Sequence, residues 1–336
     1  MAPACNLPHA RQYNPGRMLP LRYPIIIGPT AGGKTALAVE VALRLNAAEG
    51  REVAEIVSAD SMLIYKGLDI GSAKPTEQER EGIPHHLIDL VEPTQRFTIH
   101  DWLKLAHQTI AAIQSRGHFP IVVGGTHLYI KALLEGMFEG PGEDQVIRAQ
   151  LRELPQEAIR AELERVDPAA AAKLHPNDLR RSIRALEVFR LTGTPISRLQ
   201  KQWDVEREEP ADHVLIGLEW TSDQLNPRIN ARVKAMIEKG LVDEARALWE
   251  SDRLGVQARE ALGYKQLIEV FEGRTTLNQA IEEIKIETRR FAKNQRTWMR
   301  RLRITPGAVW IDASSTPPQD WPDIVLSACQ GQETTA

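Results

Sequence analysis

An eight-residue glycine-rich segment has the composition and spacing of a phosphate-binding loop. It runs Gly28-Pro29-Thr30-Ala31-Gly32-Gly33-Lys34-Thr35 and fits the pattern G-x-x-x-x-G-K-[ST]. Glycines let the backbone curl so that successive N–H groups point at phosphate oxygens, and the lysine adds a positive charge. The Thr35 hydroxyl is the expected ligand of a phosphate-bound Mg²⁺. The segment predicts a site for phosphate or pyrophosphate and does not by itself specify ATP.

Two further sets of polar residues follow predicted strands. Asp60 comes after the apolar run 55–58, and Gly124-Gly125-Thr126 comes after the run 120–123. Ligands of open parallel sheets bind outside the carboxyl ends of the strands, so Asp60 is a candidate for contact with a substrate. Gly124-Gly125-Thr126 follows the same pattern, but taken alone it is a turn with a capping threonine. A helix or turn cap is the alternative role for Asp60. Asp89 is a second candidate for supporting a metal, with a purely structural carboxylate as its alternative.

These residues require a parallel sheet to position them. The run 23–27 before the loop is β-branched, the segment 36–45 after it has helical spacing, and strands and helices continue to alternate, with a short strand expected at 87–90. From 143 to 205 the periodicity is helical only, and strand patterns return at 214–218 and 309–311. The predicted fold class is α/β, a P-loop NTPase-like parallel sheet core with a helical insertion domain. We expect a disordered leader (1–22), the core with its C-terminal helices (23–140 and 206–312), the helical insertion (141–205) and a flexible tail (313–336).

Length and composition exclude several other classes of protein. The chain has 336 residues, of which 42% are hydrophobic and 26% charged, the balance of an ordinary globular protein. No run approaches the roughly 18 apolar residues of a membrane span, so we expect no membrane association. The two cysteines are too few for a zinc site or a disulfide framework. The first two dozen residues lack the apolar core of a signal peptide, and we expect a cytoplasmic enzyme.

The net charge of −3 hides a local concentration of positive charge. Residues 285–303 carry eight basic side chains and one acidic one. Helical spacing places a cationic stripe on one face and an apolar seam on another. The stripe contains Arg289, Lys293, Arg296, Arg300 and Arg303, and the seam contains Ile284, Thr288, Phe291, Gln295, Trp298 and Leu302. Because acids are nearly absent, contact with a phosphate backbone is favoured over a solvated face. A second cluster, Arg180, Arg181 and Arg184, could bind phosphates or pair with nearby acids.

Taken in order, these motifs resemble those of the tRNA dimethylallyltransferases, also called tRNA isopentenyltransferases, of the bacterial type. The similarity extends from about residue 24 to residue 303. The matching strings lie at 28–35, 58–62, 67–76, 84–89, 123–126, 128–129, 175–178, 184–188, 262–264 and 288–300. The resemblance implies transfer of a dimethylallyl group from dimethylallyl diphosphate to the exocyclic amino group of the adenosine 3′ to the anticodon in tRNA, with release of pyrophosphate.

The resemblance also implies roles for individual residues. Asp60 matches the family's general base, Thr126 a substrate-contacting threonine, and Arg148 an arginine near the entrance of the active site. With Lys34 these form the predicted catalytic set, and the loop 28–35 would hold the pyrophosphate with Mg²⁺ on Thr35. The positions that match tRNA-contacting segments are Asp60, Ser61, Met62, Leu63, Arg180, Arg181, Arg184, Tyr264, Lys265, Gln266, Lys293, Gln295, Arg296, Trp298 and Arg300.

Two positions depart from the family pattern, and other functions stay open. Asn294 stands where the family more often has arginine, and His127 where glycine or methionine is common. The alternatives are an isopentenyltransferase acting on adenine nucleotides, a small-molecule kinase with the same core, and an RNA-binding protein with a vestigial loop. The arginine-bearing insertion favours a large RNA substrate, and the intact Lys34, Thr35 and Asp60 argue against a vestigial loop. We expect a monomer that binds tRNA.

Overall fold

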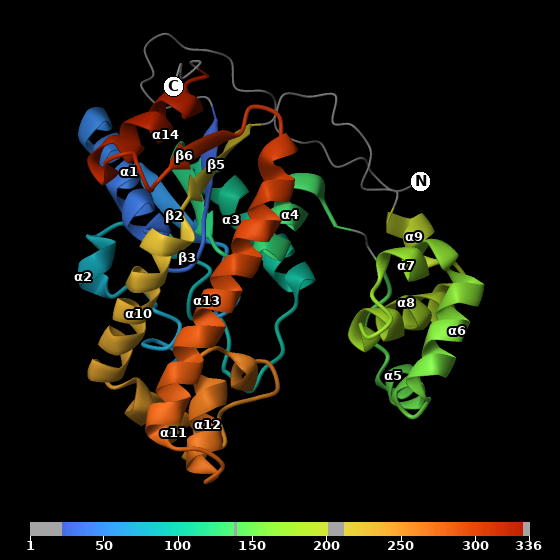
Figure 1. The fold of residues 1–336 in the computed structure, drawn as a ribbon. Helices are drawn as coiled ribbons and strands as arrows, with labels where there is room; N and C mark the ends of the chain where they lie inside the picture. The colour runs from blue at the N-terminus through green and yellow to red at the C-terminus, as the bar shows by residue number, and fades with distance from the viewer. Residues whose placement is uncertain (1–21, 138–139, 201–211, 332–336) are drawn as a thin grey trace. The chain divides into compact units, whose positions relative to one another are not determined.

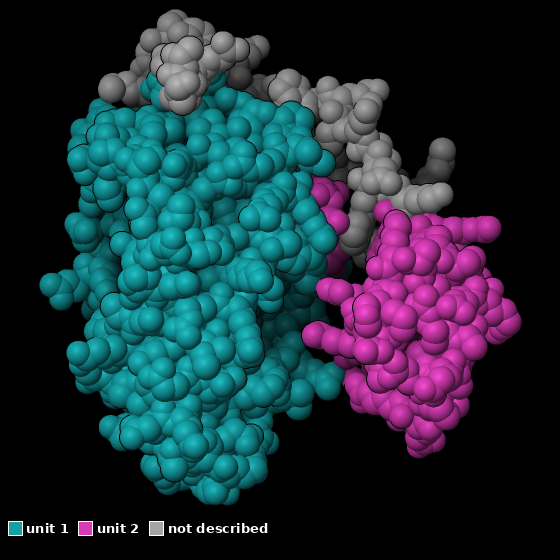
Figure 2. Space-filling model, in the orientation of Figure 1, with its two compact units in different colours: residues 1–130, 211–336 teal, residues 131–210 magenta. Residues whose placement is uncertain are grey.

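The computed structural model describes residues 22–137, 140–200 and 212–331. It divides into two compact units, which Figure 2 colours separately: unit 1 contains residues 1–130 and 211–336, and unit 2 contains residues 131–210. Unit 1 is built on a six-stranded sheet with the strand order β3-β2-β4-β1-β5-β6, in which every pairing is parallel. The strands are β1 (Tyr23–Ile27), β2 (Ala54–Ser58), β3 (His85–His86), β4 (Phe119–Gly124), β5 (His213–Glu219) and β6 (Val309–Asp312). The predicted fold class is confirmed.

Helices cover both faces of this sheet. The chain passes from β1 to β2 in one direction along the sheet and from β3 to β4 in the other, so right-handed crossovers place α1 and α3 on opposite faces. Helix α14 packs beside α1 and against β1, β5 and β6. The bounds of the helices between β1 and unit 2, and of α14, are α1 (Lys34–Glu49), α2 (Glu77–Arg80), α3 (Ile99–Ser115), α4 (His127–Glu135) and α14 (Trp321–Cys329).

The chain between β5 and β6 forms a second set of helices in unit 1. They are α10 (Ser222–Glu238), α11 (Leu241–Glu250), α12 (Tyr264–Phe271) and α13 (Leu277–Arg301), with short 3₁₀ turns at Ala258–Glu260, Leu302–Ile304 and, before α14, Pro318–Asp320. The long α13 packs against both α10 and α12, and Figure 1 shows it running past the sheet. A capping box at Thr276 and Gln279 starts α13, because each side chain bonds the other residue's backbone N–H.

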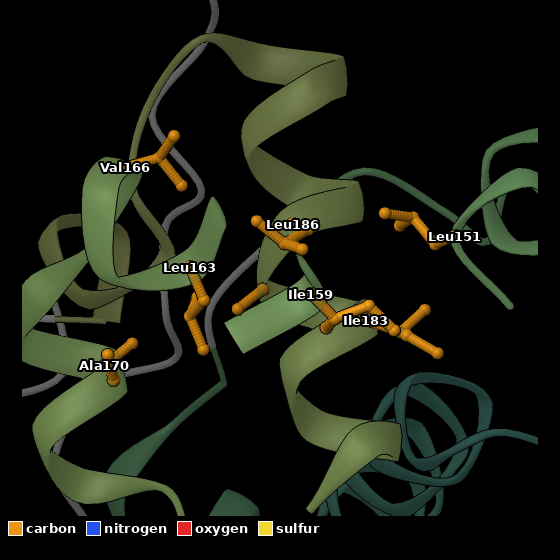
Figure 3. Close-up of a cluster of buried hydrophobic side chains, with 9 residues drawn as sticks. Leu151, Ile159, Leu163, Val166, Ala170, Ile183 and Leu186 are labelled. Carbon is orange, nitrogen blue, oxygen red and sulfur yellow. The ribbon is translucent and has the colours of Figure 1, made fainter. Parts of the chain in front are cut away.

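Unit 2 is helical, as predicted for the insertion. Its helices are α5 (Gln145–Arg152), α6 (Gln156–Val166), α7 (Pro168–Lys173), α8 (Leu179–Thr192) and α9 (Ile196–Leu199). Figure 3 shows its apolar core, in which Leu151, Leu163 and Leu186 are fully buried. Such a core indicates that unit 2 has packing of its own, independent of the sheet.

Three sequence-based boundaries need correction. Residues 313–331 are not a flexible tail, because they include α14, whose Trp321, Val325 and Cys329 are buried. Of the predicted leader only Arg22 is described, and it is held by a hydrogen bond to the carbonyl oxygen of Ala328 at 2.8 Å. The short strand expected at 87–90 lies instead at 85–86, since Leu87 and Asp89 adopt positive φ angles that end the strand.

Candidate active site

The predicted loop, Asp60 and Thr126 follow three strands that are neighbours in the sheet. Strand β4 lies between β2 and β1, and all three are parallel, so their carboxyl ends meet at one edge. Gly124 allows the ends of β4 and β2 to approach closely, because a Cβ there would lie 2.1 Å from the carbonyl oxygen of Ala59. The arrangement brings together residues separated by up to 98 positions in the chain, from Gly28 to Thr126.

The glycine-rich loop curls around the amino group of its own lysine. Gly33 has φ +89°, in the left-handed region that favours glycine, and α1 begins at the next residue. Lys34 Nζ donates to the carbonyl oxygen of Pro29 at 2.7 Å. Burial, and the nearby Arg232 cation, lower the pKa of Lys34 to about 8, although the Asp60 carboxylate acts in the opposite direction. The lysine and Arg232 thus form a cationic site that favours an anionic ligand.

Asp60 and Thr126 both accept hydrogen bonds from the short segment 61–62. Asp60 Oδ1 accepts from the N–H of Met62 at 2.9 Å, and Thr126 Oγ1 accepts from the N–H of Ser61 at 2.9 Å. The capping alternative for Asp60 is therefore partly correct, since the carboxylate does close a turn. Its second oxygen has no hydrogen bond within the described chain, and the residue lines a cavity.

Two cavities meet at the lysine of the loop. The first, which we call the Asp60 cavity, has a volume of about 330 Å³ and is lined by Asp60, Ser61, Met62, Leu63 and Thr126 among others. The second, the loop cavity, has a volume of about 890 Å³ and is lined by the loop from Ala31 to Thr35 and by Arg228. Six residues line both cavities: Lys34, Thr35, Ala73, Pro75, Arg232 and Met236. A ligand with an anionic group and an apolar group can therefore extend from one cavity to the other.

Sequence reasoning missed several residues that hold the loop. Trp220, directly after β5, donates its Nε1–H to the carbonyl oxygen of Gly32 at 3.1 Å. Arg228 Nε donates to the carbonyl oxygen of Ala31 at 3.0 Å, and its guanidinium lies over the Trp220 ring. The ring of Trp321 on α14 packs beside Gly33. The spacing of four between Arg228 and Arg232 was the available signal, but isolated arginines on a predicted helix do not indicate a site.

Gln295 has a different role from the predicted tRNA contact. Its side chain is buried and joins α13 to both neighbouring strand ends. Gln295 Oε1 accepts from the N–H of Thr30 at 2.7 Å, and its Nε2 donates to the carbonyl oxygen of Gly125 at 2.9 Å. The residue therefore fixes the loop against the end of β4 and cannot face solvent.

Replacing Gln295 by alanine is expected to loosen the loop. Two backbone groups, the half-buried N–H of Thr30 and the buried carbonyl of Gly125, would lose their partner, at a cost of about 1–3 kcal/mol in the free energy of unfolding. Urea unfolding measures this loss, and a binding assay with inorganic pyrophosphate should show weaker binding. Thr297→Ala serves as the control on the same helix, because Thr297 is exposed and its hydroxyl donates to the carbonyl oxygen of Lys293 within α13. An unchanged unfolding free energy in Gln295→Ala would contradict the assigned role.

Other predicted tRNA contacts on unit 1 also need correction. Tyr264 and Gln266 are buried, and the Tyr264 hydroxyl donates to Glu244. Burial and the Glu244 carboxylate raise the pKa of Tyr264, so it stays a neutral structural donor. Lys265 is exposed but pairs with Glu260. Neither buried side chain can reach an RNA without a rearrangement of the helices.

Only part of the cationic stripe on α13 is free to contact an RNA backbone. Arg289 donates to Asn230 Oδ1, and Arg296 donates to the carbonyl oxygen of Trp220 and to Ser222. Lys293 and Arg300 are exposed, and within the described ranges neither side chain has an ion pair. The expected apolar seam is wrong at one position, because Phe291 is 43% exposed and lines the Asp60 cavity. Trp298 is half-buried, with Arg301 over its ring.

The predicted residues of the insertion have contacts within unit 2. Arg148 forms hydrogen bonds at 2.9 Å with both carboxylate oxygens of Glu187, and Arg184 also bonds Glu187. Burial acts to raise the pKa of Glu187, but its hydrogen bonds to the two arginines lower the pKa overall. Arg181 pairs with Asp178, and Arg180 is exposed. The alternative of pairing with acids thus applies to Arg181 and Arg184. Arg148, predicted near the entrance of the active site, is also engaged by an acid, Glu187.

No protein cage for a metal exists among the described residues. They contain no group of three or more His, Cys, Asp or Glu side chains that could hold a metal ion. Asp89, the second candidate carboxylate, pairs with the buried Lys74 and lines neither cavity. Its role is therefore the structural one that the sequence left open. The exposed Thr35 hydroxyl on the loop fits a Mg²⁺ that takes its other ligands from phosphate and water, the usual mode for this ion.

Comparison with known proteins gives consistent matches. The family model described as IPP transferase matches residues 63–302. The tRNA dimethylallyltransferase of Geobacillus thermodenitrificans is 44% identical over 82% of this chain and 86% of its own length, and that of Bacillus subtilis is 42% identical over 88% and 91%. The crystal structure of a tRNA isopentenylpyrophosphate transferase from Bacillus halodurans has 36% identity and a TM-score of 0.67, covering 93% of this chain and 97% of that one. A eukaryotic dimethylallyltransferase acting on tRNA has 27% identity and a TM-score of 0.80, covering 94% and 81%.

The parallel sheet with a phosphate loop after its first strand defines a P-loop α/β protein. Within that class, the extent of the family match and the sequence identity to the curated relatives determine the family. The chain belongs to the IPP transferase family, whose enzymes transfer prenyl groups. The resemblance seen in the sequence motifs is confirmed. None of the helices in the described ranges has the length and apolar character to cross a membrane.

Proposed function

We propose that the chain transfers a dimethylallyl group from dimethylallyl diphosphate to the exocyclic amino group of the adenosine 3′ to the anticodon (position 37) in tRNAs, and releases pyrophosphate. The observation that carries this proposal is the meeting of the two cavities at Lys34. One holds a carboxylate that can accept a proton, and the other holds a cationic loop that can accept a diphosphate. The names of the relatives agree with this assignment.

The loop cavity is the proposed site of the donor's diphosphate. The backbone N–H groups of the loop and the N-terminus of α1 favour an anion there, and Lys34 and Arg232 add two cations. As the bond between C1 of the prenyl group and the diphosphate oxygen breaks, its electron pair leaves with pyrophosphate. Positioned cations and N–H groups stabilise that developing charge. Thr35 would hold a Mg²⁺, which when bound supplies further charge neutralisation to the diphosphate.

The Asp60 cavity is the proposed site of the extruded adenine base. The lone pair of the amino nitrogen forms the new bond to C1, and the nitrogen then has one proton too many. Asp60 is placed to accept that proton through the carboxylate oxygen that does not close the turn with Met62. Thr126 orients Ser61 and the start of this segment. Holding both reactants at one junction supplies most of the catalysis, because the reaction then becomes effectively unimolecular.

The tRNA backbone requires basic residues outside the cavities. On α13 the exposed Lys293 and Arg300 supply them, and in unit 2 the exposed Arg180 is the corresponding candidate. Residues that contact phosphate determine affinity and orientation, and the flipped base is recognised in the pocket. With tRNA as the substrate, we place the reaction in the cytoplasm and expect a monomer to carry it out.

Neutralising Lys293 and Arg300 together should flatten the salt dependence of tRNA binding. Each lost phosphate contact lowers the slope of log K against log salt by about 0.9 for a duplex, so the pair should lower it by up to about 1.8. Filter binding at several salt concentrations measures the slope. Arg290→Ala is the matched control on the same helix, because Arg290 already pairs with Glu287. A folded double variant with the wild-type slope would show that this face of α13 does not contact the tRNA backbone.

The alternatives predict different products in one assay. The protein is incubated with dimethylallyl diphosphate and either bulk tRNA or AMP, and nucleosides are analysed by mass spectrometry. We expect the prenyl nucleoside from tRNA alone. Prenylation of AMP at a comparable rate would favour an adenine-nucleotide isopentenyltransferase, and steady ATP hydrolysis without tRNA or donor would favour a kinase-type activity.

A further inference from the structure

One face of α10 changes along its length from cationic to apolar. Arg228, Arg232 and Met236 recur at intervals of four residues, so they occupy successive turns about 6 Å apart on the same face. Arg228 lines the loop cavity, whereas Arg232 and Met236 line both cavities. A ligand lying along this face would place its anionic head by the arginines and a short apolar chain by the methionine.

We call the place where the two cavities meet the junction. The part of its wall that lies beside Met236 is held by several hydrogen bonds. Ala73 and Pro75 are the other apolar residues that line both cavities, and they belong to the segment 67–76. The Glu244 carboxylate accepts from the N–H of Ile70 at 2.8 Å and from that of Gly71 at 3.1 Å, which anchors this segment to α11.

Two more contacts leave little freedom for the segment. A Cβ on Gly71 would lie 2.3 Å from the ring of Tyr264, so the backbone there sits directly on the buried tyrosine. Lys74 is buried and donates to the carbonyl oxygen of Tyr65 at 2.9 Å and to Asp69 at 2.6 Å. Ala73 itself has φ +51°, a conformation that disfavours larger side chains.

We infer that Met236 sets the length of the prenyl chain that the junction accepts, an inference that rests on the proposed function. The junction joins the diphosphate site to the site of the reacting amino group, so C1 of the donor must lie there and its apolar chain must extend from that point along the junction walls. Its other apolar walls are fixed by the segment 67–76. The flexible, half-buried thioether of Met236 is the adjustable boundary. It admits the five-carbon dimethylallyl group and excludes the ten-carbon geranyl group.

Donor competition tests this inference. The ratio of kcat/KM for geranyl diphosphate to that for dimethylallyl diphosphate is measured on the same tRNA for the wild type and for Met236→Ala. One methylene in a hydrophobic pocket changes discrimination about 10- to 200-fold, so the truncation should raise the ratio at least about tenfold. Met62→Ala is the matched control, because Met62 lines the Asp60 cavity alone and should leave the donor ratio unchanged.

A second variant keeps the inference testable if the first fails to fold. Met236→Phe should narrow the junction and lower kcat/KM for dimethylallyl diphosphate, while the inhibition constant of inorganic pyrophosphate stays at the wild-type value. An unchanged donor ratio in active Met236→Ala, or unimpaired dimethylallyl transfer by Met236→Phe, would overturn the role of Met236. Absence of dimethylallyl transfer by the wild type would instead refute the proposed function itself.

Discussion

Replacing Asp60 by asparagine is expected to slow prenyl transfer by about 10²–10⁴-fold, the usual contribution of a general base. The turn should survive, because Oδ1 of asparagine can still accept from the N–H of Met62, as Asp60 Oδ1 does at 2.9 Å. What is lost is the negative charge and the ability to take the proton from the amino group. Single-turnover rates at saturating tRNA and donor measure the chemical step, and filter binding should show nearly unchanged affinity for tRNA.

The matched control for this prediction is Asp89→Asn. It makes the same chemical change at the other acidic candidate of the sequence, which pairs with Lys74 and lines neither cavity. Asparagine also tolerates the positive φ of +54° at this position. We expect the control to retain most of the transfer rate. A near-normal rate in Asp60→Asn would show that another group, or water, accepts the proton.

Removal of the Lys34 amino group is expected to have the second largest effect. Lys34→Ala deletes the cation where the two cavities meet, and loss of one such electrostatic group lowers kcat by about 10²–10³-fold. Binding of inorganic pyrophosphate should weaken as well, because in the proposed mechanism the lysine contacts the leaving group before and after bond cleavage. Isothermal titration with pyrophosphate and single-turnover rates separate the two effects. If Lys34→Ala bound pyrophosphate as tightly as the wild type does, Lys34 would not be part of the pyrophosphate site.

The lowered pKa of Lys34 adds a pH dependence with a definite sign. Burial and Arg232 bring the pKa to about 8, so the free enzyme carries the cation below that pH and loses it above. Consequently kcat/KM for the donor should be highest below about pH 8 and should fall as the pH rises through that value. Arg232→Gln removes one cause of the lowered pKa and should shift this fall to higher pH, although the overall rate is reduced. A profile that stays flat through this range would contradict the assignment.

Much of the fold follows from local patterns in the sequence. The strand 23–27 was predicted with its observed bounds, because a β-branched run ends at a glycine turn there. The insertion was recognisable because the strand period disappears between 143 and 205. The meeting of the loop with Asp60 and Thr126 followed from one rule, that parallel strands end at a common edge.

The parts that could not be predicted depend on contacts between distant segments. Arg232 and Met236 come from a helix that begins almost 200 residues after the loop, and no local motif marks them. Gln295 was placed correctly on the apolar seam of α13, but its contacts to Thr30 and Gly125 were not predicted, because spacing alone does not show what a buried side chain meets. The helix α14 was missed because its amphipathic run is short and follows a proline-rich turn.

Localising the product on a defined RNA tests the central claim most directly. A synthetic anticodon stem-loop with an adenosine 3′ to the anticodon is incubated with the protein and dimethylallyl diphosphate, and tandem mass spectrometry locates any added mass. We predict one five-carbon group on the exocyclic amino group of that adenosine, none on the same RNA with guanosine at that position, and greatly reduced transfer by Asp60→Asn. Absence of transfer from the wild-type protein, or prenylation at another nucleotide, would contradict the account.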